Sequence, residues 1–307
     1  MEVKHMSDSV MNNKIDFMAI VTVENANPNG DPAGGNRPRQ HYDGTGFITP
    51  VCIKRKLRNR LQDMGRNILI QQNNRPGTEF SSIVERLNSV PEIKEARKNK
   101  AKDKKSKDSG NNTALVEKIC QYYEDVRAFG ATIVLQKKSE NESGDSVGIR
   151  GPVTIQTVTS IDSVDVEDVQ ITKSTNSTPE DKKGSDTMGH MYCVRYGIYV
   201  IKGSINPLLA KGTGFSEEDM NDIKEALRTL FVNDESAARP SGSMNVYKLY
   251  WWKQDAQNIR YSSKKLFDTV KIKKKNPDEV INSTDDIEIT VEKLPDGDIT
   301  PEIIEGF

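Results

Sequence analysis

Apolar residues recur at every second position in several short segments of the chain. Between residues 15 and 24, every second position from Ile15 to Val23 is apolar, and this period of two is typical of a β-strand. The alternate positions carry polar residues together with Met18 and Ile20, so we interpret the segment as a half-buried strand. The same reasoning predicts strands at residues 130–136, 191–202 and 244–253, and an edge strand at 286–292.

Two segments show helical spacing instead. From Ile53 onward, apolar residues recur at helical intervals, which places one apolar stripe on a helix over residues 50–64. Thr49 is a preferred N-cap residue, and Pro50 fits the first helical position, where no N–H is needed. A second helix over 216–231 is indicated by its own apolar stripe, a capping box and an acidic first turn.

These elements follow one another in the order β-α-β-β-α-β. That order is typical of the ferredoxin-like, split βαβ arrangement of RNA-recognition (RRM) domains, so the sequence predicts an α+β fold. Two insertions interrupt it. Residues 71–130 contain predicted helices at 81–87 and 115–129. Residues 148–189 contain two extended segments that predict a protruding hairpin, with a loop at 174–186.

Composition and charge narrow the class of protein. The chain has 307 residues, 35% of them hydrophobic and 29% charged, which favours a modest core with polar insertions. The net charge is −1, yet residues 37–66 hold eight Lys or Arg against two acids, and residues 276–307 hold ten acids against one Lys. This segregation favours a nucleic-acid surface with a repelling tail; the alternative is a solvated surface with an acidic tail. The basic run 94–108 is expected to be a flexible arm, which either contacts nucleic acid or is a solvated linker.

Several kinds of site are not indicated by the sequence. The three cysteines are far apart and form no CxxC pair, so neither a disulfide framework nor a zinc site is expected. The three histidines form no catalytic triad and no metal-spaced set. We therefore expect no catalytic residue, no metal and no cofactor. Because no apolar run approaches the roughly 18 residues of a membrane span, we expect a cytoplasmic protein without a membrane partner.

Cations crowd the start of the first helix. Lys54, Arg55 and Arg58 belong to a group of five cations without an acid between residues 54 and 60. Because phosphates bind to cations and to backbone N–H groups at helix N-termini, we expect these residues to bind nucleic acid; the alternative is an ordinary charged helix face. Arg37 and Arg39 flank Pro38 and are expected to bind phosphates too.

The loop that connects the first strand to this helix is rich in Asn, Pro and Gly. It lacks the Gly-Lys-Ser/Thr ending of a nucleotide-binding P-loop, so Asn27 and Asn29 either anchor the loop or contact RNA. His190 either touches RNA or closes the hairpin. The aromatic cluster at 247–252 either stacks bases or packs in the core.

Nine motifs occur in one order over residues 14–255. They are Asn27-Pro-Asn-Gly-Asp-Pro, Asn36-Arg-Pro-Arg, the run from Val51 to Asn59, the run from Asp125 to Gly130, Arg150-Gly-Pro-Val, Ser160-Ile-Asp, Thr187-Met-Gly, Tyr196-Gly and the run from Gly214 to Asp219. Together they resemble the backbone subunit of type I CRISPR surveillance (Cascade) complexes, the seventh CRISPR-associated family, and are most similar to its I-C subtype.

The resemblance implies a division into four parts: an RRM-like palm (14–70 with 130–147 and 190–255), a helical finger insertion (71–129), a β-hairpin thumb (148–189) and a C-terminal acidic extension (256–307). It also implies head-to-tail polymerisation along a guide RNA, with bases left free to pair with target DNA. Further implied partners are the large, small and guide-5′-end-capping subunits. The positions that match the family's RNA contacts are Arg37, Arg39, Lys54, Arg55 and Arg58 in the palm, and Gly151, Pro152 and Val153 at the base of the thumb.

Two other functions remain open at this point. Backbone subunits of related RNA-targeting complexes cut RNA with a loop acid, and Asp31 is the only acid here in a comparable loop. Asp31, Asp43 and Asp125 are possible nuclease carboxylates, and the alternative for each is a turn or cap residue. The other alternative is a general single-strand RNA binder without CRISPR partners.

Overall fold

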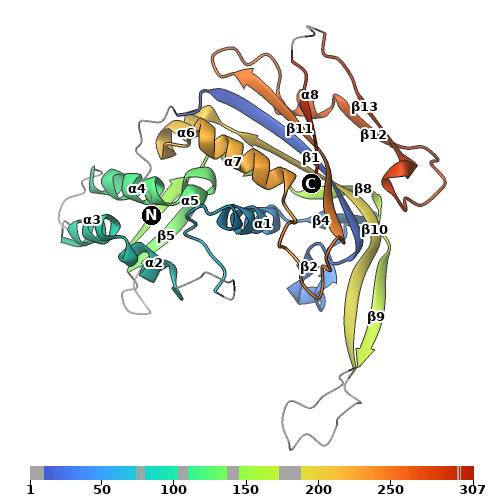
Figure 1. The fold of residues 1–307 in the computed structure, drawn as a ribbon, viewed down its shortest axis with the longest axis horizontal. Helices are drawn as coiled ribbons and strands as arrows, with labels where there is room; N and C mark the ends of the chain where they lie inside the picture. Colours follow the sequence, from blue (N-terminus) through green and yellow to red (C-terminus); the bar gives the residue numbers. More distant parts are fainter. Residues whose placement is uncertain are drawn as a thin grey trace, which may run out of the picture.

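The structure is a computed structural model that describes residues 10–73, 75, 80–102, 110–136, 145–172, 188–295, 297 and 299–307 (Figure 1). Its helices are α1 (Pro50–Asp63), α2 (Ile83–Ser89), α3 (Pro91–Lys102), α4 (Gly110–Tyr122), α5 (Glu124–Phe129), α6 (Pro207–Thr213), α7 (Glu217–Arg228) and α8 (Ser263–Phe267). Its strands are β1 (Asn13–Ala26), β2 (Gly30–Asp31), β3 (Arg37–Pro38), β4 (Thr45–Ile48), β5 (Gly130–Gln136), β6 (Asp145–Arg150), β7 (Val153–Ile155), β8 (Val158–Ser163), β9 (Val166–Thr172), β10 (Met188–Ile205), β11 (Met244–Asp255), β12 (Val270–Lys274), β13 (Ile287–Val291) and β14 (Glu302–Glu305).

The fold is mixed α+β and is built on a large antiparallel sheet. Its strand order is β14-β11-β1-β10-β8-β4, and β7 and β9 also pair with β10. The central strand β1 is antiparallel to both β10 and β11, with Phe17 opposite Gly203 on one side and Trp251 on the other. A Cβ at Gly203 would lie 2.2 Å from the Phe17 ring, so this close approach of side chain to backbone requires glycine.

Both faces of the sheet are covered. Helices α1 and α7 lie along one face (Figure 1), where β1 contributes Phe17 and Val21 to the main core. The C-terminal region covers the other face, where Met18 and Ile20 pack in a second core with Trp252 and Phe267 of α8. The interpretation of β1 as half-buried is therefore wrong, because a segment more than 200 residues later in the chain buries the second face.

The position of the predicted second palm strand also differs from the prediction. Residues 130–136 form a strand, but among the described residues β5 pairs with β6 in a separate two-stranded sheet. On the side away from β1, the second half of β10 pairs with β7 and β8, which the prediction assigned to the protruding hairpin. The hairpin that projects from the body consists of β9 and the first half of β10 (Figure 1). Periodicity identifies a strand, but it does not identify the partner strand.

The helix starts agree with the prediction. The Thr49 side chain accepts a hydrogen bond from the Cys52 backbone N–H, with Pro50 at the first helical position. Ser216 and Asp219 form the predicted capping box of α7. The predicted edge strand corresponds to β13, although it pairs with β12 rather than with the large sheet.

The 71–130 insertion is helical and has a core of its own. Helices α2 to α5 pack around residues such as Leu87, Ile93 and Ile119. The predicted helix at 115–129 is divided into α4 and α5 at Tyr123. The arm expected at 94–108 begins as helix α3. Its residues 103–108 and the whole predicted loop at 174–186 lie outside the described residues. In the described ranges no helix is long and apolar enough to cross a membrane.

Candidate nucleic-acid interface

Arg58 is held inside the protein rather than presented to solvent. Its Nε donates to Asp125 Oδ2 at 2.9 Å, and its guanidinium lies 4.9 Å from the centre of the Phe129 ring. Asp125 also accepts the backbone N–H groups of Leu69 (2.8 Å) and Ile70 (3.2 Å). Because both side chains are buried and paired, Arg58 connects α1 to α5 and to the segment after α1.

Two further α1 cations have partners within the fold. Lys56 is 4% exposed and pairs with Asp234, which also accepts from Arg239 Nε at 3.1 Å. Arg60 donates to the Thr229 hydroxyl at 2.7 Å. The Lys56–Asp234–Arg239 group contains two cations and one acid, so it retains a positive charge beside the first turn of α1. Nothing in the local sequence pattern indicated Arg239, which stands in a loop.

Lys54 and Arg55 contact no carboxylate directly, although the charge of Asp125 favours the protonated form of Arg55. Lys54 lies over the Phe129 ring at 5.8 Å, and Arg55 donates to the Ile70 carbonyl at 2.7 Å. Neither forms an ion pair with a carboxylate in the described part of the chain. Partial burial, and then the neighbouring charge of Arg58, lower the pKa of both residues. A phosphate bound here would relieve this unfavourable electrostatic interaction between cations.

Arg37 and Arg39 lie near the same end of α1, on the loop that precedes it. Arg37 is exposed, with its guanidinium 5.2 Å from the centre of the Tyr192 ring on β10 and 3.5 Å from the Val166 carbonyl. Arg39 is 3.2 Å from Asp31. Arg37 therefore retains its full charge at the base of the projecting hairpin, whereas the charge of Arg39 is partly compensated.

Asn27 and Asn29 shape the loop. The Asn27 amide donates to the Asn36 carbonyl at 2.6 Å, which closes the loop across nine residues. Asn29 Oδ1 accepts from both the backbone N–H and the hydroxyl of Thr49, at 2.9 and 3.0 Å. The anchoring interpretation is thus supported for both side chains. By fixing the N-cap residue, Asn29 also orients the N-terminus of α1.

Gly151, Pro152 and Val153 are buried where β6 leads into β7. A Cβ at Gly151 would lie 2.4 Å from the Ala128 carbonyl oxygen and 2.5 Å from the Gly130 nitrogen. The Pro152 carbonyl accepts from the Asn206 N–H, and the Val153 side chain packs in the main core. In this chain the three residues join the insertion to the sheet.

His190 lies on one face of the projecting hairpin, opposite Gln170 of β9. Its Nδ1 is 2.7 Å from Asp168 Oδ1, and its ring stacks on Tyr192 with centroids 6.1 Å apart. Tyr192, which the sequence analysis did not single out, therefore stands between His190 and Arg37. Its alternation with His190 on one strand was a signal that could have identified it.

The carboxylates considered for catalysis have structural partners. Asp31 caps a short 3₁₀ helix by accepting from the Ala33 N–H, and it pairs with Arg39. Asp43 accepts from the backbone and hydroxyl of Thr45. Asp125 accepts hydrogen bonds from Arg58 and from two backbone N–H groups.

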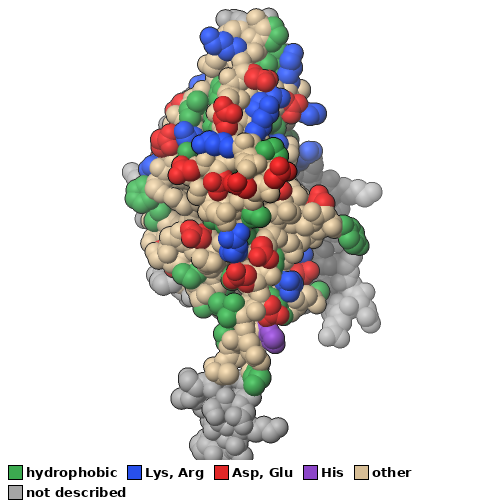
Figure 2. Space-filling model, turned by 90° about the vertical axis from the view of Figure 1, so that its right-hand side faces the viewer, with side chains coloured by type: hydrophobic (Ala, Val, Ile, Leu, Met, Phe, Trp, Pro, Cys, Tyr) green, Lys and Arg blue, Asp and Glu red, His purple; other side chains and the backbone are tan. Residues whose placement is uncertain are grey.

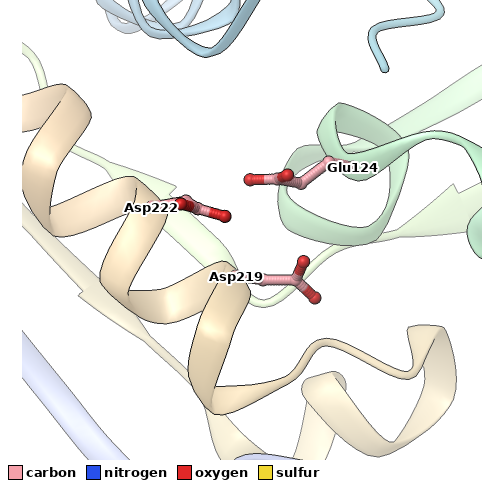
Figure 3. A group of neighbouring side chains, drawn as sticks. All are labelled: Glu124, Asp219 and Asp222. Carbon is pink, nitrogen blue, oxygen red and sulfur yellow. The ribbon is translucent and has the colours of Figure 1, made fainter. Parts of the chain in front are cut away.

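Three buried carboxylates meet between α5 and α7 (Figure 3), and the sequence analysis did not predict that they come together. Glu124 and Asp222 point toward each other, and Asp219 lies beside them. Arg127 binds both oxygens of Asp219 at 3.0 and 2.7 Å, and Arg66 donates to Asp222 at 2.7 Å. Burial, followed by the two aspartate charges, raises the pKa of Glu124 to about 8.

A metal ion is a poor fit for this cluster. Two arginines already face the three carboxylates, and Asp219 has both oxygens bound. A divalent cation would therefore leave an excess of positive charge, whereas one proton would balance the group. Glu124 Oε1 and Asp222 Oδ2 are buried without a hydrogen-bond partner, and one proton shared between them would satisfy both.

The remaining surfaces offer less to a nucleic acid. Tyr250, Trp251 and Trp252 are buried in the two cores, which supports the packing interpretation of the aromatic cluster. Figure 2 shows the side of the molecule where β12 and β13 lie, and acidic and basic side chains are interspersed on it. Ion pairs such as Lys274–Asp162 and Lys271–Glu292 account for part of this mixture.

Comparison with known proteins identifies the family. The sequence model of the family described as CRISPR-associated protein Cas7 matches residues 13–292. The chain belongs to the Cas7 family. The membership inferred from the nine motifs is thus confirmed.

Relatives of this Cas7-family chain include the CRISPR-associated protein Cas7 of Haloferax volcanii, which is 31% identical over 132 residues. That match covers 42% of this chain and 35% of the relative, so it spans about a third of the relative's length. Similar solved chains come from a CRISPR RNA-guided surveillance complex in a pre-nicking state (TM-score 0.44, 13% identity, 78% of each chain) and from a second CRISPR RNA-guided surveillance complex (TM-score 0.41, 16% identity, 78% of this chain and 68% of the other).

Proposed function

We propose that this chain is the backbone subunit of a Cascade-type complex, most similar to subtype I-C, and that it binds the sugar-phosphate backbone of a CRISPR guide RNA. Copies of the chain assemble head-to-tail along the RNA, and the exposed bases pair with target DNA. The subunit acts in the cytoplasm as a non-catalytic scaffold, together with the large, small and guide-5′-end-capping subunits.

The observation that carries this proposal is that Lys54 and Arg55, in the N-terminal half of α1, form no ion pair with a carboxylate among the described residues. Four of the eight cations of the 37–66 segment, Arg39, Lys56, Arg58 and Arg66, pair with carboxylates within the fold. Lys54, Arg55, Arg60 and Arg37 form no ion pair with a carboxylate among the described residues, and Arg60 is bound instead to the Thr229 hydroxyl. Their neighbourhood also retains the excess charge of the Lys56–Asp234–Arg239 group. Such a surface attracts phosphates without reading base sequence.

The strand order supports an RRM-like palm. Strands β11, β1, β10 and β8 are neighbours in one antiparallel sheet, with α1 after β1 and α7 before β11. This is the arrangement of a split βαβ fold in which β8 replaces the predicted strand 130–136. In the proposed division, α2 to α5 form the fingers and the β9–β10 hairpin forms the thumb.

The other residues predicted to contact RNA keep a role in the proposal, but the role differs from the predicted one. Arg39 and His190 reach RNA only by sharing or exchanging their aspartate partners, and Arg58, Asn27 and Asn29 act by positioning α1 and its loop. Gly151, Pro152 and Val153 join the insertion to the sheet rather than touch RNA with their side chains.

The test is the affinity of the full chain for a single-stranded RNA at several salt concentrations. For wild type we expect affinity to fall steeply with salt, because each neutralised phosphate of a single strand contributes a slope of about −0.7. Combined substitution K54Q, R55Q and R37Q should flatten this dependence by about 2. Equal slopes for wild type and the triple variant would refute the assignment of these cations.

A further inference from the structure

A pocket of about 260 Å³ lies where the end of α1 meets the helical insertion. It is separate from the cations at the N-terminal half of α1. The residues of its wall that matter here are Gln62, Asn67, Phe80, Arg86, Tyr122 and Tyr123. They combine amide groups, aromatic rings and a positive charge.

Two amide side chains in the wall are available to a ligand. Neither Gln62 nor Asn67 forms a side-chain hydrogen bond within the described ranges. Each carboxamide offers two donors and an acceptor in one plane. Such groups match the edges of nucleobases, where Asn and Gln pair with adjacent donors and acceptors.

Arg86 supplies a buried positive charge that has no carboxylate within ion-pair distance among the described residues. It is 4% exposed, and it donates to the carbonyls of Leu69 at 3.0 Å and Phe80 at 2.9 Å. It forms no ion pair with a carboxylate in the part of the chain that the structure describes, and its Nε has no hydrogen-bond partner there. A buried cation without a counterion favours an anionic ligand nearby.

Together these features specify a ligand that is planar, aromatic, rich in hydrogen-bonding groups and negatively charged. We propose that the pocket binds a mononucleotide, that is, one base with its phosphate. The rings of Phe80, Tyr122 and Tyr123 supply aromatic surface for the base, Gln62 and Asn67 supply contacts for its edge, and Arg86 attracts the phosphate. A pocket of about 260 Å³ has room for one nucleotide rather than two.

The nucleotide has two conceivable sources. Arg55 and Gln62 are seven residues apart and lie on the same face of α1, about 10 Å apart along the helix axis. A strand bound at Arg55 would therefore pass close to the pocket, and one of its nucleotides could enter. The other source is a free nucleotide. The proposal does not depend on the guide-RNA function, since free nucleotides can be tested on the subunit alone.

The experiment uses the full chain, titrated by calorimetry and saturation-transfer NMR with AMP, GMP, CMP and UMP and with the matching nucleosides. We expect at least one monophosphate to bind, and its nucleoside to bind about tenfold more weakly because the charge-assisted contact is lost. Q62A and N67A should each weaken binding about tenfold. Asn258→Ala, an exposed amide after β11, is the matched control and should change nothing.

Substitution of Arg86 would also remove its hydrogen bonds to two backbone carbonyls and so disturb the fold. The test therefore uses variants of Gln62 and Asn67. Displacement of the bound nucleotide by a short single-stranded RNA would identify the strand as the source, and its failure to compete would identify free nucleotide. Absence of binding by all four monophosphates to wild type would overturn the proposal. The proposed RNA-backbone function is tested separately from the mononucleotide pocket. K54Q is expected to lower the affinity for single-stranded RNA and to leave mononucleotide binding unchanged, so each proposal can fail without the other.

Discussion

Arg58 and Asp125 form a buried ion pair, with Nε and Oδ2 2.9 Å apart, across 67 residues of sequence. Asp125 accepts two backbone N–H groups as well, so the pair joins α1, the segment after it and α5. The cation-rich run at 54–60 thus contains a residue that stabilises the fold rather than one that is free for binding.

Replacing Arg58 should therefore destabilise the protein. In R58A the buried Asp125 carboxylate loses its cation, and removal of one partner of a buried pair costs about 3–5 kcal/mol. The comparison is K54A, whose side chain has no carboxylate partner in the described fold, and which should change the free energy of unfolding by less than about 1 kcal/mol. Urea denaturation measures both. Equal stability of R58A and wild type would show that the pair is not structural.

The salt dependence of RNA binding separates the cations individually. K54Q and R37Q should each reduce the slope of log affinity against log salt by about 0.7, because each removes one phosphate contact from a single strand. Lys264→Gln on α8 is a suitable control, because Lys264 is highly exposed and pairs with Asp268. If Lys264→Gln lowered the slope as much as K54Q does, RNA would bind non-specifically over the protein surface rather than at α1.

Stability should depend on pH through Glu124. Burial raises its folded-state pKa from 4.5 to about 8, so between these values the folded protein keeps a proton that the unfolded chain releases. Stability from this group is fully present below pH 4.5 and declines as pH rises toward 8. Urea denaturation at pH 5 and pH 8.5 should show a larger decrease for wild type than for E124Q, whose amide does not titrate. A decrease of equal size in both proteins would contradict the assignment.

Replacing Gly151 by a larger residue should destabilise the protein, because the added Cβ would clash with the backbone. A Cβ there meets backbone atoms of Ala128 and Gly130 at 2.4–2.5 Å, and overpacking of this kind costs about 1–3 kcal/mol. Gly148, three residues earlier on β6, has nothing within 4 Å of a Cβ. G148A is therefore the matched control and should retain wild-type stability in thermal denaturation. If G151A were as stable as G148A, the proposed joint between the insertion and the sheet would be wrong.

The scaffold function and the ribonuclease alternative predict different results for the substitution D31A. Because Asp31 caps a 3₁₀ helix and pairs with Arg39, D31A should free Arg39 and leave RNA affinity equal or higher. Incubation of wild type with labelled target RNA should give no cleavage products. Cleavage by wild type that disappears in D31A would favour the alternative.

Local signals in the sequence predicted local features well. Thr49 and Ser216 cap the helices that they were expected to cap, because caps depend on residues three positions away. Partners distant in the sequence could not be predicted. Two such features are the ion pair between Arg58 and Asp125 and the pairing of β5 with β6 instead of β10. Both depend on how the insertion folds back onto the sheet, which hydrophobic periodicity does not encode.

The candidate site shows the same limit. The cation run at 54–60 was visible in the sequence, yet which of its members stay free depends on distant acids such as Asp125 and Asp234. Tyr192 was missed because its partner Arg37 comes from another part of the chain, and Arg239 was missed because its neighbour Asp234 pairs with the distant Lys56.

The central claim is that copies of this chain form a scaffold on RNA, and one measurement tests it most directly. The protein is expressed with a repeat–spacer transcript, and the purified particles are examined by electron microscopy and nuclease protection. The account predicts regularly spaced subunits along an uncut, protected RNA. Monomers without RNA, or RNA that is steadily degraded, would contradict it.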